Sequence, residues 1–277
     1  NQPEYRSLPP SQIVPSLADK GVYLASESSF YRVLKKHQQQ NHRGRMKPPR
    51  KVPEPTSFTA TGPNQVWTWD ISYCPSAVRG QHWYLYLIMD IYSRKIVAWE
   101  IHESESGELA KKLVERALLR EGCWHNPPVL HSDNGAPMTS YTLKARLADL
   151  GMLMSHSRPR VSNDNPYSES LFRTVKYCPE WPSKGFESLT AVRDWMLAFE
   201  YAYNEKHLHS GINFVTPADR HRGLDLQRLA HRKRVYESAK RRNPQRWSGS
   251  TRNWEVTGSV SLNPGKLQEV ELNKLAA

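Results

Sequence analysis

The chain has 277 residues, a formal net charge of +12 and 38% hydrophobic residues, a length that predicts two or three domains. Its basic balance favours a polyanionic partner, because neutralising phosphates releases their condensed counterions. Three cysteines without CxxC spacing argue against a disulfide framework or a structural zinc site, so we expect a reducing, cytoplasmic compartment. No apolar run reaches the ~18 residues that a membrane span needs. The chain begins at Asn1 without Met, and we expect a fragment of a longer protein.

Positive charge is concentrated in two regions of the chain. Residues 28–53 contain eight Lys or Arg and no acid, and residues 220–252 contain eleven against only Asp225 and Glu237. Two basic regions that flank a more neutral middle predict two arms gripping a long anion. The simpler interpretation of charge alone is a soluble basic protein.

The first 40 residues predict two short helices. Ser11 can cap a first helix that Gly21 ends, and Ser26 or Ser28 can cap a second. This pattern is typical of a helix-turn-helix domain over residues 1–40, although an ordinary helical hairpin fits equally well. The DNA-facing residues of the second helix would be Ser29, Arg32, Lys35 and Lys36.

Composition then divides the rest of the chain. Residues 41–63 are rich in Gln, Arg, Lys and Pro and predict an extended basic linker. Residues 64–222 hold the periodic strands and helices of a larger domain. Residues 223–277 form a basic C-terminal region, predicted as a helix that ends near Asn243 and a strand over residues 254–262.

The larger domain begins with a strand of period two. From Gln65 onward Trp and Ile alternate with polar residues, which places the polar set on one face. Two more strands, 82–89 and 95–101, predict an antiparallel meander. A helix capped by Ser106, a strand at 129–132, a helix at 140–150, a strand at 152–155 and a helix introduced by Asn165-Pro166 follow. This order predicts an α/β ribonuclease H-like fold, a mixed five-stranded sheet with flanking helices.

Three carboxylates occur in this domain. Asp70 lies mid-strand, Asp133 ends the fourth strand, and Glu169 lies near a helix start. Because the first and fourth strands neighbour each other in this fold, we expect the three acids to converge. Three oxygen donors without His or Cys suit two Mg²⁺ ions, with Mn²⁺ as a substitute. Two such ions would support in-line phosphoryl transfer.

Each acid also has an ordinary interpretation. Asp70 could be a hydrogen-bonded strand residue, Asp133 a turn residue and Glu169 a helix N-terminal acid favoured by the dipole. Their joint occurrence favours the metal site. Asp90 and Asp164 are competing acids that we place in turns.

Basic residues accompany these acids. Arg173 and Lys176 share a helix face with Glu169 and would contact phosphates, unless they form only solvent-exposed salt bridges. In the C-terminal helix the expected DNA contacts are Arg232, Arg234, Arg241 and Arg242.

The motifs resemble those of retroviral-integrase-like D,D-35-E transposases. They are Trp69-Asp70-Ile71-Ser72, His131-Ser132-Asp133-Asn134-Gly135 and Asn163-Asp164-Asn165-Pro166-Tyr167-Ser168-Glu169-Ser170. Tyr203-Asn204, His209-Ser210-Gly211-Ile212 and Thr216-Pro217-Ala218 are similar to the end of the catalytic domain in bacterial insertion-sequence transposases of the two-frame orfA/orfB type. The resemblance covers roughly residues 8–222.

The resemblance implies the following activity and site. Asp70, Asp133 and Glu169 would hold two Mg²⁺ ions, and Lys176 and Asn134 would contact DNA. The enzyme would cleave the ends of an insertion element and join them to DNA as a homo-oligomer on its terminal inverted repeats, in the bacterial nucleoid. Two rivals remain: a non-catalytic helix-turn-helix DNA-binding regulator, and a ribonuclease H-like nuclease that hydrolyses strands without joining them.

Overall fold

The computed structural model describes residues 2–40, 56–158 and 164–264. The chain forms two compact units, Asn1–Pro53 and Glu54–Ala277. No helix of the described residues is both long and apolar enough to cross a bilayer.

The first unit contains two helices, α1 (Pro10–Asp19) and α2 (Glu27–Lys36), after a 3₁₀ turn, η1 (Pro3–Tyr5). The predicted cap Ser11 is wrong, because α1 begins one residue earlier, with Pro9 at the N-cap and Pro10 preset for the first helical turn. The connection runs from Lys20 to Ser26, whereas helix-turn-helix turns usually have about 3–4 residues. The structure therefore shows the two helices, and the helix-turn-helix assignment stays a prediction.

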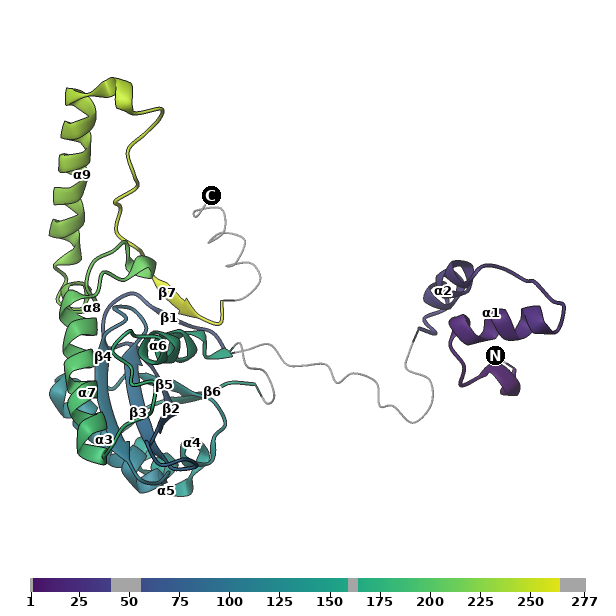
Figure 1. The fold of residues 1–277 in the computed structure, drawn as a ribbon, viewed down its shortest axis with the longest axis horizontal. Coiled ribbons are helices and arrows are strands. Elements are labelled where there is room, and N and C mark those ends of the chain that lie inside the picture. The colour runs from purple at the N-terminus through teal and green to yellow at the C-terminus, as the bar shows by residue number, and fades with distance from the viewer. Residues whose placement is uncertain (1, 41–55, 159–163, 265–277) are drawn as a thin grey trace. The chain divides into compact units, whose positions relative to one another are not determined.

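The second unit is built on a mixed five-stranded sheet of order β4-β3-β2-β5-β6 (Figure 1). Its strands are β2 (Val66–Pro75), β3 (His82–Asp90), β4 (Ile96–His102), β5 (Val129–Ser132) and β6 (Met154–His156). The first three form an antiparallel meander, and β5 and β6 add in parallel to β2. The predicted ribonuclease H-like fold is confirmed.

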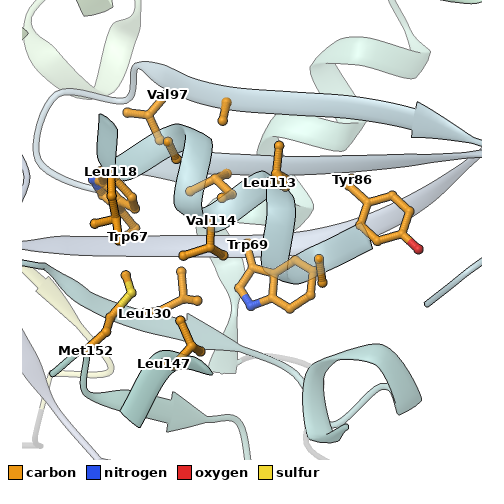
Figure 2. Packing of buried hydrophobic residues seen from close by; sticks show 14 of the residues in the cluster. Trp67, Trp69, Tyr86, Val97, Leu113, Val114, Leu118, Leu130, Leu147 and Met152 are labelled. Atoms are coloured by element: carbon orange, nitrogen blue, oxygen red, sulfur yellow. The ribbon is translucent and has the colours of Figure 1, made fainter. Parts of the chain in front are cut away.

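Helices cover both faces of this sheet. One face packs on α3 (Gly107–Arg120), α4 (Ala136–Thr139) and α5 (Tyr141–Asp149), and the other on α6 (Pro166–Lys176) and α7 (Leu189–Tyr201). Figure 2 shows Trp67 and Trp69 packed with Leu113 and Leu147 on the first face. Side chains alternate along β2, so Thr68 and Asp70, which alternate with these tryptophans, face α6.

The helix starts follow from local capping. The hydroxyl of Ser106 accepts hydrogen bonds from the backbone N–H groups of Glu108 and Leu109 at the start of α3. Ser140 accepts one from Leu143 at the start of α5. The predicted cap Ser106 is confirmed, Ser140 caps the helix that was predicted over residues 140–150, and each satisfies a donor that the helix leaves free.

A small two-stranded sheet joins the two ends of the second unit. Strand β1 (Phe58–Ala60) pairs antiparallel with β7 (Val260–Leu262). The first of these strands lies inside the range predicted as linker, and the second is shorter than the predicted strand. Ala60 and Leu262 are fully buried together with Ile91, so this pairing is anchored by a cluster of apolar side chains.

The segment after α7 changes from an α-helix to a π-helical turn. The α-helix ends at Tyr201 and a π-helical turn, η3 (Ala202–Lys206), follows. A 3₁₀ turn η4 (Ser210–Ile212), α8 (Pro217–His221), α9 (Asp225–Arg242) and η5 (Pro244–Arg246) complete the chain up to β7. Helix α9 confirms the predicted basic helix, and its Leu229 packs on Trp254 and Ile212.

Candidate active site

Asp70 lies in the middle of β2, on the face that α6 covers. The parallel register pairs Thr68 of β2 with His131 of β5. Two residues further on lie Asp70, still within β2, and Asp133, one residue past the end of β5, so the pairing directs both acids toward the same end of the sheet. The sequence predicted that Asp70 and Asp133 lie near each other, and the pairing of β2 with β5 is the reason.

Helix α6 is tied to β2 at its first turn. The Thr68 hydroxyl donates to the Asn165 side-chain oxygen and lies 2.8 Å from the Ser168 hydroxyl. The Asn165 side-chain nitrogen donates to the Trp69 carbonyl at 3.4 Å. Asn165 holds the N-cap position but makes no side-chain cap, so its predicted capping role is replaced by these bonds. They hold the first turn of α6 against β2, the strand that carries Asp70. Glu169 follows Asn165 by one helical turn.

A second set of bonds fixes the segment just before α6. His131 Nε2 lies 3.0 Å from the Asp164 carbonyl oxygen and Nδ1 lies 3.0 Å from the Ser155 hydroxyl. Because a carbonyl only accepts, Nε2 carries the proton. Arg158 forms an ion pair with the Asp164 carboxylate at 2.8 Å. Burial lowers the pKa of His131, which keeps it neutral, and the Arg158 bond lowers the pKa of Asp164.

The acids influence one another electrostatically. Burial, together with the charges of Asp133 and Glu169, raises the pKa of Asp70 to about 7, and the charge of Lys176 opposes this rise. The four side chains therefore share one region of the surface. Within the described ranges, however, no three His, Cys, Asp or Glu side chains are close enough together to hold a metal ion. The three predicted acids are therefore near one another, but they are not close enough together to form a complete metal site.

The turn that carries Asp133 is held from two sides. The Gly135 N–H donates to the Asp133 carboxylate at 3.3 Å. The Asn134 side-chain amide donates to the Ser157 carbonyl at 2.7 Å, so this predicted DNA-binding residue has an internal partner. A Cβ at Gly135 would lie 2.7 Å from the sulfur of Met138, which is buried. The turn thus needs glycine for close packing.

The two competing acids are accounted for by protein partners. Asp90 is fully buried at the end of β3, and its carboxylate accepts hydrogen bonds from the backbone N–H groups of Asn64 at 2.8 Å and Ser93 at 2.7 Å. Asp164 pairs with Arg158 as described above. Neither residue is among the groups that shift the pKa of Asp70.

The predicted basic residues fall into separate settings. Arg173 and Lys176 are exposed on α6, and the charge of Lys176 acts on Asp70. In α9, Arg234, Arg241 and Arg242 are exposed. Arg232 differs, because its guanidinium donates to the Asn213 carbonyl at 3.1 Å and lies 5.3 Å from the centre of the Trp254 ring.

The basic residues of α2 belong to the first unit. Arg32 donates to the Ser29 hydroxyl at 3.0 Å, and Arg32, Lys35 and Lys36 are exposed. These residues and the three acids thus belong to different units of the chain.

Sequence reasoning missed the polar residues that hold α6. Thr68, His131 and Ser168 are buried, and none of them is a metal-ligand type in the expected all-oxygen carboxylate set. The available signal was position: Thr68 lies two residues before Asp70 on the same strand face, and His131 lies two residues before Asp133.

The chain has relatives of known family. The family description Integrase core domain matches residues 60–162 and again residues 150–217. The transposase for insertion sequence element IS904 of Lactococcus lactis is 33% identical over 165 residues, covering 58% of this chain and 63% of the relative. The transposase InsF for insertion sequence IS3A of Escherichia coli is 31% identical over 120 residues, covering 43% and 40%. The matches thus span less than two thirds of the length of these relatives.

The simian T-cell lymphotropic virus intasome, in complex with a PP2A regulatory subunit, contains a chain that is 15% identical with a TM-score of 0.49, covering 76% of this chain and 74% of that one.

Replacing Thr68 with Val should loosen the start of α6. The substitution keeps the shape of the side chain but removes the buried Thr68 partner of the Asn165 side-chain oxygen and of the Ser168 hydroxyl, which costs about 1–3 kcal/mol. We expect faster amide hydrogen exchange in the first turn of α6 and unchanged exchange in α3. Thr174→Val, which removes an exposed hydroxyl bonded to the Ser170 carbonyl, is the matched control. Equal exchange in both variants would contradict the role of Thr68.

Replacing Asp70 with Asn should change how stability depends on pH in chelator-treated protein. The folded protein keeps a proton on Asp70 up to about pH 7, whereas the unfolded carboxyl loses it near its ordinary pKa of 3.8. The folded state therefore binds more protons between these values, and this residue lowers stability as pH rises through that window. Asn cannot ionise. The measured quantity is the Tm of Asp70→Asn minus the Tm of the unmodified protein, from thermal melts. We expect this difference to increase from pH 4 to pH 7. A constant difference would show that Asp70 ionises normally.

Proposed function

Because the chain belongs to the integrase core domain family over residues 60–217, we propose that it is a DNA transposase that cleaves the ends of an insertion element and joins them to DNA. The proposal is supported above all by the parallel register of β2 with β5 and by the bonds from Thr68 to the first turn of α6, which bring Asp70, Asp133 and Glu169 toward one end of the sheet. Three acids and a Lys ammonium in one region suit a phosphodiester together with its counterions.

The residues present fit divalent cations. Burial and two neighbouring acids penalise the ionised form of Asp70, and a cation would remove that penalty by supplying the missing positive charge. All three side chains offer oxygen atoms, which suits Mg²⁺ or Mn²⁺. We propose that Asp70, Asp133 and Glu169 hold two Mg²⁺ ions. When bound, such a pair activates the attacking hydroxyl and stabilises the leaving oxygen.

The chain's own residues provide orientation and charge. The bonds from Thr68 to Asn165 and Ser168 fix α6, and with it the position of Glu169 relative to Asp70. Lys176 and Arg173 would meet the phosphates beside the scissile bond, because both are exposed on α6. The His131 bond to the Asp164 carbonyl supports the same helix from its N-terminal side.

The remaining basic residues would bind DNA away from the chemistry. We propose that Arg234, Arg241 and Arg242 of α9 contact phosphates, as do Arg32, Lys35 and Lys36 of α2. The substrates would be terminal inverted repeats and target DNA in the bacterial cytoplasm, with the protein acting as a homo-oligomer on them. Arg232 and Asn134, which have internal partners, would orient neighbouring segments.

Replacing Asp133 with Asn should abolish cleavage and joining while DNA binding stays within about twofold. Asn keeps the shape of the turn but removes the negative charge that the cations require. Strand transfer is measured on oligonucleotides of candidate element ends with and without Mg²⁺, and binding by fluorescence anisotropy. The matched control is Asp149→Asn at the exposed end of α5, which should keep full activity.

The same assay separates the rival functions. A non-catalytic regulator would bind the ends without any Mg²⁺-dependent product, and a nuclease would release cut strands without joined species. Substantial Mg²⁺-dependent joining by Asp133→Asn would rule out the assigned site.

Replacing Arg234, Arg241 and Arg242 together with Gln should flatten the salt dependence of DNA affinity. Each lost phosphate contact lowers the slope of log K against log salt by about 1. Arg228→Gln is the control. Arg228 also lies on α9, but its guanidinium is paired with the Asp219 carboxylate, so we do not expect it to contact a phosphate. An unchanged slope in the triple variant would show that these three arginines do not contact DNA phosphates.

A further inference from the structure

A cavity of about 490 Å³ lies between the C-terminal half of α6 and the π-helical turn η3. Arg173 and Tyr177 line it from α6, and Phe199, Tyr203 and His207 line it from the other side. Its volume falls in the range of sites for small organic ligands. Among its described lining residues there is no acid.

One wall of the cavity belongs to a continuous aromatic stack. Trp195, Phe199, Tyr203 and His207 follow one another at intervals of four residues, with ring centres 5.2, 5.8 and 5.4 Å apart and neighbouring planes within 15, 19 and 14°. The π-helical turn continues this alignment past the end of α7, where the His207 N–H donates to the Ala202 carbonyl at 2.8 Å. Phe199 and Tyr203 inside this stack are buried, whereas His207 at its end is exposed.

The positive charge of the cavity comes from Arg173. Partial desolvation lowers the pKa of His207 and keeps its ring neutral near pH 7, although the residue as a whole is exposed. Arg173 is one helical turn beyond Glu169 on α6, and its guanidinium lies 5.9 Å from the centre of the Tyr177 ring. The cavity thus combines aromatic rings and one guanidinium beside the helix that carries a proposed metal ligand.

This combination selects one chemical class of ligand. A flat aromatic ring can stack on the exposed ring of Tyr177 or His207, and a phosphate can pair with Arg173. A base paired within a duplex has both of its faces covered by its neighbours, so only an unpaired nucleotide can enter.

We propose that the cavity between α6 and η3 receives one unpaired base of the DNA end, with its phosphate at Arg173. The inference rests on the proposed function, because it takes the strand at Asp70 and Glu169 as DNA. An unpaired base held there would fix the register of the strand along α6, which determines the phosphate that reaches the acids.

The proposal is tested by binding in the absence of catalysis. Two probes share one duplex sequence, one blunt and one with a two-nucleotide unpaired extension that carries 2-aminopurine, and full-length chain binds them in buffer without divalent cations. We expect about tenfold tighter binding of the extended probe, with quenching of 2-aminopurine fluorescence by stacking. Tyr177→Ala and His207→Ala, which remove exposed lining residues, should each reduce both effects and leave blunt-duplex affinity unchanged.

The matched control is Tyr201→Ala, since Tyr201 is exposed on α7 but does not line the cavity. It should keep the preference and the quenching. Equal affinity for the two probes, or a preference that both lining variants retain, would overturn the cavity assignment while leaving the transposase proposal intact. Failure to bind either probe would overturn both.

Discussion

The placement of Asp70 inside the sheet is the constraint on which the rest of the site depends. Burial and two acidic neighbours raise its pKa to about 7, so the folded chain carries an unfavourable group unless positive charge arrives. Lys176 supplies part of that charge. The core built around Trp67 and Trp69 on the opposite face holds β2 in place against this cost. The site is therefore prepared for cations by the same strand that anchors the hydrophobic core.

Helix α6 is fixed to the strand that carries Asp70 and positions other residues of the site relative to it. Its first turn is bonded to Thr68 of β2, and its buried stripe, with Leu171 and Val175, packs together with apolar residues of the sheet and of α7. Its exposed stripe carries Glu169 and Arg173. Because one rigid helix bears both the acid and the guanidinium, the spacing between metal ligand and phosphate contact is set by helical geometry rather than by loops. The same rigidity aligns the cavity with the acids.

Much of the catalytic domain could be predicted because its signals are local. The alternation around Trp67, the caps Ser106 and Ser140, and the strand order follow from patterns within short windows. The two-stranded sheet could not be predicted, because Ala60 meets Val260 across the whole unit. Likewise, the basic composition of α9 shows that it is charged, but not that Arg232 is engaged by Trp254 and the Asn213 carbonyl.

The amino-acid sequence by itself determined the fold class, the order of the elements and the three acids, since residue type and period dictate which side chains face the sheet. Tertiary structure alone decided how those acids are held. The bonds of Thr68 and His131 join residues far apart in the chain, and the stack from Trp195 to His207 depends on a π-helical turn that no local pattern marks. Burial raises the pKa of Asp70 only once α6 covers β2, because desolvation is a property of the packed interior and not of the residue.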